Sequence, residues 1–258
     1  MTITSTELAA LLGAWLWPFV RIAALVSSAP IIGTRAVPPR IRVLLALALS
    51  GLLVPVLPAA PLIEPLSPAG VLVTLQQVLI GLVLGLSLRL IFTAVEFAGQ
   101  LLGQQMGLGF AAMVDPTSGN QVPVVSQLYM LLATLLFLSL NGHLLMLEAL
   151  AESFHTVPVG IHGVTHEGIG VLLRWAGELF AQAMVMALPT ITALLIVNVA
   201  YAILARAAPQ LNIFAVGFPL TLMAGAVVIY LTLASLPQHL RSLIDLALLA
   251  VRQILTSP

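Results

Sequence analysis

The residues best placed to do chemistry are polar side chains that recur within one long apolar run near the middle of the chain. Stepping 100° per residue, as in an α-helix, places these side chains and several glycines within roughly 140° of one another. The polar members are Arg89, Thr93, Glu96, Gln100 and Gln104, and the glycines are Gly81, Gly85, Gly99, Gly103 and Gly107. A central arginine in lipid costs about 2.5–3.5 kcal/mol. We therefore expect this face either to pack against a neighbouring helix, with Arg89 and Glu96 satisfying each other, or to line a wet lumen.

The segment from Met106 to Asn120 comes next in the chain and differs in composition. It is rich in small residues, carries large flexible apolar side chains and ends in turn-forming residues; its notable members are Met106, Gly107, Gly109, Phe110, Met113, Asp115 and Pro116. Methionine and phenylalanine on a glycine-rich loop can adapt to differing surfaces, which suits a deformable seal. From these residues alone, a surface loop that packs down locally is the favoured interpretation.

A cluster of histidines and acids invites a metal-site interpretation. It consists of His155, His162 and His166 with Glu152 and Glu167. His162 and His166 have i, i+4 spacing, but Gly160, Gly163 and Gly168 argue against a helix that would hold them together, so a polar loop is the better interpretation. The chain shows no catalytic Ser/His/Asp pattern and no phosphate-binding loop. We expect no enzymatic activity, no metal and no cofactor.

Composition decides the solvent in which these elements fold. Only 7% of the 258 residues are charged and 60% are hydrophobic, whereas a soluble domain has about 25% charged residues. Nine arginines, nine acids and no lysine are too few to cover a soluble globule, so most of the surface must face lipid or apolar partner proteins. The formal net charge is zero, which gives no indication of nucleic-acid binding, and there is no cysteine.

The apolar runs predict an all-α membrane protein. They fall at roughly 8–29, 41–57, 69–95, 124–151, 168–205 and 211–236, followed by an amphipathic helix over 238–256, and we expect one domain over 1–258. The fifth run is too long for a simple bilayer crossing. Pro189 in its middle should kink or break the helix, and Pro219 interrupts the next run in the same way. Long, proline-bent helices favour packing against protein.

The end of the fifth run predicts a structural turn. Arg206 stands just before Pro209, which cannot continue a helix, and a guanidinium near a helix C-terminus can bind several unpaired carbonyl groups. We expect Arg206 to clasp the turn that follows and to help in partner contact. The other residues of that turn are Pro209, Gln210, Asn212, Phe218 and Pro219.

Several short motifs occur in a fixed order over nearly the whole length. They are Ala29-Pro30 with Arg35-Ala36-Val37-Pro38, Gln76-Gln77-Val78-Leu79-Ile80-Gly81, Met106-Gly107-Leu108-Gly109-Phe110 with Val114-Asp115-Pro116, Phe137-Leu138-Ser139-Leu140-Asn141-Gly142-His143, Phe154-His155-Thr156-Val157-Pro158, Ala187-Leu188-Pro189, and Arg206 to Phe214 with Gly217-Phe218-Pro219-Leu220. With these motifs the chain resembles the FliR family of flagellar export-gate proteins, whose injectisome relatives are called SctT. The flagellar branch fits better.

The resemblance implies a non-enzymatic subunit of the flagellar type III export gate in the bacterial inner membrane, within the flagellum basal body. Similar proteins assemble as one copy with several FliP and FliQ subunits, and FlhB associates with the complex. The gate is a conduit for unfolded flagellar subunits, and a loop of this subunit plugs its lumen. By position in the motif that loop is Gly107 to about Asn120, so the resemblance favours a seal over a surface loop, with Met106, Phe110 and Met113 as its apolar members.

One alternative from another class remains open at this point. A small-molecule or ion transporter could use Arg89, Glu96 and Glu148 as an intramembrane relay, because ionisable residues within membrane helices are costly and often functional. Co-elution with FliP- and FliQ-like proteins would distinguish a gate subunit from a transporter that is stable alone.

Overall fold

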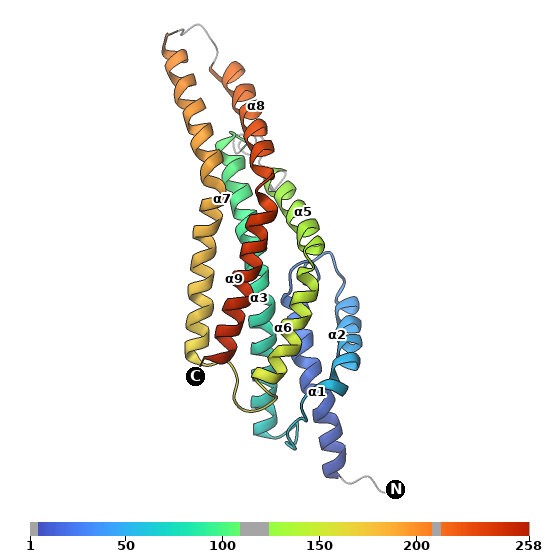
Figure 1. Cartoon of the computed structure of the whole chain (residues 1–258). Helices are drawn as coiled ribbons and strands as arrows, with labels where there is room; N and C mark the ends of the chain where they lie inside the picture. Colours follow the sequence, from blue (N-terminus) through green and yellow to red (C-terminus); the bar gives the residue numbers. More distant parts are fainter. Residues whose placement is uncertain (1–4, 109–123, 208–212, 258) are drawn as a thin grey trace. The chain divides into compact units, whose positions relative to one another are not determined.

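The computed structural model describes residues 5–108, 124–207 and 213–257. This part of the chain is nearly all helical and contains no β-strand, which confirms the all-α expectation. In chain order the helices are α1 (Ser5–Ser28), α2 (Pro39–Leu53), the 3-10 helix η1 (Val54–Val56), α3 (Pro68–Gln105), α5 (Val124–Ser139), α6 (Gly142–Thr156), α7 (His166–Ala207), α8 (Ile213–Leu233) and α9 (Leu236–Thr256) (Figure 1).

The chain divides into two compact units. Unit 1 comprises Met1–Ile91, Leu140–Gly177 and Ile244–Pro258, and unit 2 comprises Phe92–Ser139 and Glu178–Leu243. Helices α3, α7 and α9 therefore each contribute residues to both units. The single domain expected over 1–258 stays a prediction.

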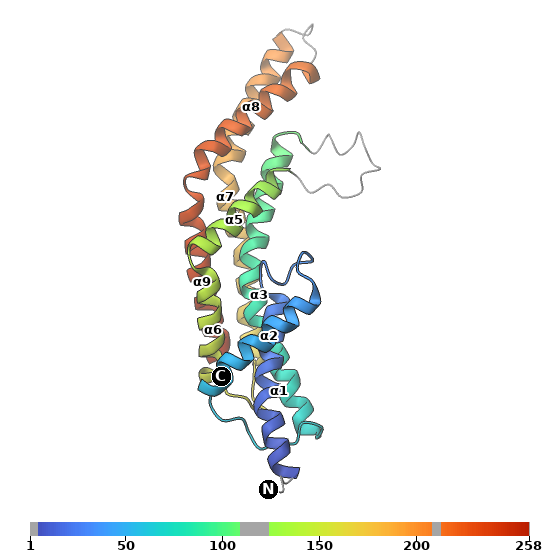
Figure 2. The ribbon, with the colours of Figure 1, turned by 90° about the vertical axis from the view of Figure 1, so that its right-hand side faces the viewer.

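The core of unit 1 forms where α1 lies along the first part of α3, as Figures 1 and 2 show. Two glycines of α3 permit a close approach, because a Cβ atom at Gly81 would overlap the backbone oxygen of Arg21 and one at Gly85 would overlap the hydroxyl of Ser28. Trp17 is fully buried, and its indole nitrogen donates a hydrogen bond to Thr74 Oγ1 at 3.3 Å. Small residues on one helix thus let the large side chains of the other fill the core.

The other helices of unit 1 are joined to this pair and to each other by polar contacts. On α7, Trp175 Nε1 donates to the backbone oxygen of Ser87 on α3 at 3.3 Å. At the end of α9, the hydroxyls of Ser257 and Thr165 lie 3.0 Å apart, and Thr165 in turn accepts a hydrogen bond from the backbone N–H of Gly168 in the first turn of α7.

Unit 2 has an aromatic and small-residue core of its own. In the core, Phe92 and Phe137 meet edge to face at 5.3 Å between ring centroids; at the surface, the half-buried Phe97 and the exposed Phe180 do so at 5.7 Å. A Cβ at Gly99 of α3 would lie 2.7 Å from the Cα of Ser126, so α5 approaches the α3 backbone closely there. The hydroxyl of Ser126 donates to the backbone oxygen of Glu96 at 3.1 Å, which fixes the register of the two helices.

Neither Pro189 nor Pro219 ends its helix. α7 continues through Pro189 over 42 residues, and α8 continues through Pro219 over 21 residues. Of the two outcomes expected for Pro189, a kink or a break, the break does not occur. A proline removes one backbone hydrogen bond, and in an apolar helix neighbouring groups can satisfy the carbonyl that it frees, so the helix continues past it.

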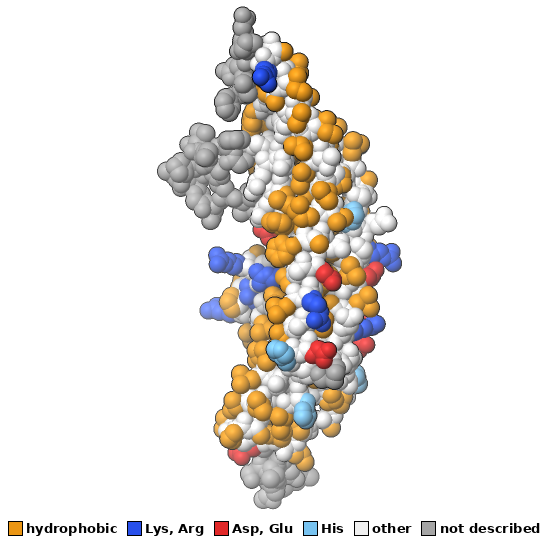
Figure 3. All heavy atoms as spheres, turned by 90° about the vertical axis from the view of Figure 1, so that its left-hand side faces the viewer, with side chains coloured by type: hydrophobic (Ala, Val, Ile, Leu, Met, Phe, Trp, Pro, Cys, Tyr) orange, Lys and Arg blue, Asp and Glu red, His pale blue; other side chains and the backbone are white. Residues whose placement is uncertain are grey.

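Much of the helix surface is apolar and open. Leu47 and Leu52 in unit 1 and Tyr230 and Leu231 in unit 2 are among the exposed large apolar side chains of the helices. Figure 3 shows hydrophobic side chains over much of the face that it draws. Within the described residues, three helices are long and apolar enough to cross a membrane, or up to five spans if two pairs separated by short breaks each count as one.

Candidate functional site

The helix α3 ends where the segment expected to form the seal begins. Gly107 has a φ of 80°, in the left-handed region that an L side chain rarely adopts. Its backbone N–H donates to the oxygen of Gln104 at 3.0 Å, and the N–H of Leu108 donates to the oxygen of Gly103 at 3.1 Å. This pair of bonds is a Schellman motif, which satisfies the last carbonyl groups of the helix and turns the chain away from its axis.

Met106, the residue before this turn, is buried within unit 2. Its side chain is 6% exposed, and a Cβ at Gly225 of α8 would lie 2.5 Å from its Cγ. The hydroxyl of Thr221 on α8 reaches its backbone oxygen at 3.5 Å. Met106 therefore anchors the end of α3 against α8. The sealing role of Met106 and Gly107 stays a prediction, and the other members, Gly109, Phe110, Met113, Asp115 and Pro116, lie outside the described residues.

The polar and glycine face of α3 separates into two parts. The glycines Gly81, Gly85, Gly99 and Gly103 are buried, and the first three receive a neighbouring helix closely. Arg89, Thr93 and Gln104 are exposed, and Glu96 and Gln100 are half-buried. The glycines therefore allow neighbouring helices to pack closely against α3. The polar side chains lie at or near the surface, and their role in lining a lumen or contacting a partner stays a prediction.

Three residues of the expected turn lie in described helices, one in α7 and two in α8. Arg206 is exposed in the last turn of α7, and Phe218 and Pro219 are exposed in α8. Pro209, Gln210 and Asn212 lie outside the described residues. The clasp formed by Arg206 stays a prediction.

The structure brings together one polar cluster that the sequence did not indicate, centred on Arg21 of α1. Its guanidinium is fully buried and donates to Gln77 Oε1 on α3 at 2.8 Å. It also donates to the backbone oxygens of Ser153 in α6 and of Val157, the residue after α6, at 2.8 Å each. It also stacks over the ring of Phe154, 4.1 Å from the centroid.

This arrangement holds the C-terminal end of α6 against α1 and α3. The last carbonyl groups of a helix carry partial negative charge, so a cation placed there is favourable without a carboxylate partner. The one available signal in the sequence was a lone arginine inside an apolar run, because such a residue must face the protein interior and find acceptors there.

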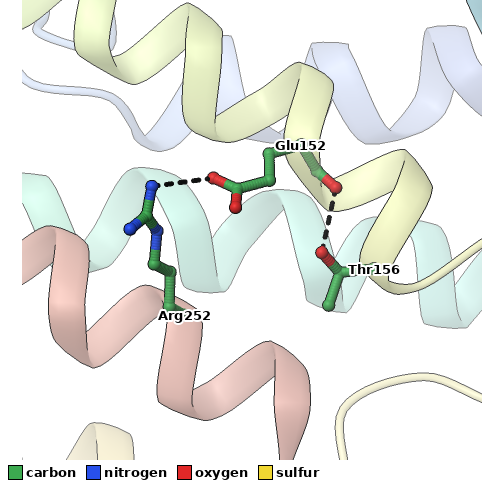
Figure 4. Close-up of polar contacts among 3 residues, drawn as sticks. All are labelled: Glu152, Thr156 and Arg252. Carbon is green, nitrogen blue, oxygen red and sulfur yellow. Dashed lines mark hydrogen bonds and ion pairs between the residues drawn. The ribbon is translucent and has the colours of Figure 1, made fainter.

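The groove between α6 and the end of α9 was likewise not predicted. It has a volume of about 430 Å³, and its lining includes the apolar side chains Leu145, Leu248 and Leu255. One ion pair joins its two helices, Arg252 Nη2 to Glu152 Oε2 at 3.3 Å, and the hydroxyl of Thr156 donates to the backbone oxygen of Glu152 at 3.1 Å (Figure 4). Glu148 also lines this groove on α6, so it lies on a different helix from Arg89 and Glu96, its partners in the expected relay.

Most of this chain of long apolar helices matches a known protein family. A model of the family described as bacterial export proteins, family 1, matches residues 12–247. The chain is 42% identical over 247 residues to the flagellar biosynthetic protein FliR of Pectobacterium carotovorum subsp. carotovorum, with 94% of both chains covered. It belongs to the FliR family of bacterial export proteins.

Other relatives extend this similarity. FliR of Escherichia coli K12 is 40% identical over 225 residues, covering 87% of this chain and 86% of the relative. FliR of Bacillus subtilis 168 is 29% identical over 245 residues, with 94% of both covered.

Membership in the FliR family settles the broad class of function. The chain is a membrane-associated flagellar export protein of a structural family, and family membership implies partners within the export apparatus. Within the part of the chain that the structure describes, no group of three His, Asp or Glu side chains could hold a metal ion.

Proposed function

We propose that the chain is a subunit of the flagellar type III export gate in the bacterial inner membrane, where it forms part of the conduit for unfolded flagellar subunits. The observation that carries this proposal is the match to bacterial export proteins over residues 12–247. FliP-like and FliQ-like subunits surround it in the gate, and an FlhB-like protein associates with the assembly. The energy for export comes from other components.

The exposed apolar surface supports an assembled state in the membrane. In the most apolar stretch of α7 only 22% of residues are buried, and in that of α2 only 11% are. Soluble monomers rarely leave such large contiguous apolar areas in water. Lipid and apolar partner subunits together cover these faces in the gate.

The seal is the second part of the proposal. Gly107 directs the chain out of α3, and Met106 fixes the point of departure by packing against α8. A segment that starts from a rigid anchor can close a lumen with its own apolar side chains and still be displaced by substrate. Phe110 and Met113 supply those side chains.

Ion leakage tests this proposal. Deleting Phe110 to Asp115 should make membranes that contain the assembled gate permeable to small ions, measured as loss of an ion gradient in cells or vesicles. The pair Phe110→Gly and Met113→Gly should leak in the same direction, because it removes apolar bulk and keeps the length of the segment.

A matched control uses two exposed leucines of unit 1. Leu62→Gly and Leu66→Gly remove similar bulk from side chains that are 86% and 91% exposed. They should leave the membrane tight. Equal leakage from both pairs, or no leakage from the deletion, would contradict the seal.

A further inference from the structure

Three arginines gather where the chain enters α2. Arg35 belongs to the turn before the helix, and Arg40 and Arg42 belong to its first turns. The guanidinium of Arg42 donates from Nη2 to the backbone oxygen of Thr34, which draws the turn against the start of the helix. Arg35 is thereby placed beside the helix end that carries Arg40 and Arg42.

The turn that presents this cluster is ordered by its own hydrogen bonds. The backbone N–H of Gly33 donates to the oxygen of Ala29 at 3.0 Å, and the N–H of Val37 donates to the oxygen of Thr34 at 3.2 Å. The hydroxyl of Thr34 donates to the oxygen of Ile31 at 2.7 Å. A cluster on an ordered turn loses little conformational entropy when it binds a ligand.

The charge of the cluster is not neutralised locally. The chain has no acidic residue between Glu7 and Glu64. Arg35 and Arg40 are exposed, and neither has an ion-pair or hydrogen-bond partner among the described residues. Two free guanidinium groups beside a third are suited to a phosphate group, which each can bind through two parallel hydrogen bonds.

The helix that follows is suited to hydrocarbon. α2 buries only Ala46 and Ser50, one turn apart on a single face. Its other faces expose apolar side chains, among them Ile41, Leu44 and Leu47. An apolar helix with arginines at one end matches a phospholipid, whose acyl chains lie along the helix and whose phosphate lies at the level of the arginines.

We propose that Arg35, Arg40 and Arg42 form a binding site for the phosphate of an anionic membrane lipid, with its acyl chains along the exposed face of α2. Arg35 and Arg40 bind the headgroup, and Arg42 positions the turn. The site requires only that α2 face the bilayer, so it does not depend on which subunits complete the gate.

The test measures lipid binding to the full-length protein in detergent by native mass spectrometry. Dioleoyl-phosphatidylglycerol should bind in preference to dioleoyl-phosphatidylcholine. The double variant Arg35→Gln/Arg40→Gln should weaken phosphatidylglycerol binding by about 30-fold, from roughly fivefold for each arginine at an anionic surface. The control Arg174→Gln/Arg241→Gln removes the same charge from two exposed arginines elsewhere and should leave binding unchanged.

Two further arms keep the result interpretable. Arg35→Lys/Arg40→Lys keeps the charge and should bind within about fivefold of the wild type, so a loss in the glutamine variant alone cannot be ascribed to misfolding. A photo-crosslinker at Leu44 should label lipid in membranes. Equal binding of both lipids, equal loss in the control variant, displacement by excess inorganic phosphate, or crosslinking of Leu44 to protein alone would each overturn the proposal.

Discussion

Replacing Arg21 by methionine should destabilise unit 1 more than any surface arginine substitution. Methionine keeps an apolar stem of similar reach and removes every donor of the guanidinium. Gln77 Oε1 and the backbone oxygen of Val157 then lose the donors that they have at 2.8 Å, whereas the backbone oxygen of Ser153 keeps the N–H of Val157 at 3.0 Å. Each unsatisfied buried acceptor costs about 1–3 kcal/mol, so the two together cost roughly 2–6 kcal/mol.

Part of this loss is offset, because the variant no longer buries a charge. Removing a buried guanidinium from low-dielectric surroundings returns several kcal/mol of desolvation free energy. We therefore expect a net loss of about 2 kcal/mol in the free energy of unfolding. At about 2–4 °C per kcal/mol for a chain of this size, the apparent Tm should fall by roughly 4–8 °C.

Intrinsic fluorescence in detergent at one fixed heating rate provides the assay, since Trp17 and Trp175 are both buried in unit 1. The control is Arg252→Met, which breaks an ion pair whose side chains are 62% and 45% exposed. Exposed pairs contribute at most about 1 kcal/mol, so this variant should shift the Tm by no more than about 2–4 °C. Equal shifts for the two variants would refute the role assigned to Arg21.

Three other substitutions test the local geometry. Gly107→Ala should lower stability by about 1–2 kcal/mol because it places a Cβ at positive φ, whereas Gly177→Ala, with open space around it, should not; thermal unfolding measures both. Gly103→Leu should block assembly or motility because Gly103 is buried, and Leu101→Ile should be tolerated because volume is kept; normal motility in the glycine variant would refute the packing argument. Arg206→Lys keeps charge but loses the planar fork, so it should weaken co-purification with a FliP-like partner if Arg206 clasps its turn, and wild-type assembly would favour a simple charge anchor.

Local features of the fold were the easiest to predict from the sequence. The period of the apolar runs predicts the helices. The end of α3 was not predicted: the spacing placed Gly107 on the helical face, but α3 ends at Gln105 and Gly107 adopts the left-handed conformation that caps it. Which side chains on a helix face are buried was harder to predict from the sequence. Periodicity placed the glycines and polar side chains of α3 on one face, but only the position of α1 and α5 determines that the glycines are covered and Arg89 and Gln104 are not.

Contacts between residues far apart in the sequence were the hardest to predict. The partners of Arg21 lie 56 to 136 residues away, and two of them are backbone oxygens, which no residue-type pattern reveals. The groove between α6 and α9 has the same origin, since its ion pair joins residues 100 positions apart. For Pro189 the sequence left a kink or a break open, and the structure excludes only the break, because α7 continues through it.

The most direct test of the central claim is the composition of the purified complex. The tagged full-length chain is co-expressed with FliP-like and FliQ-like proteins from the same genome, extracted in mild detergent and weighed by native mass spectrometry. An export-gate subunit should elute as one copy with several copies of each partner, and the complex should be lost without this chain. A chain that elutes alone or only with itself, stable and free of both partners, would contradict the account.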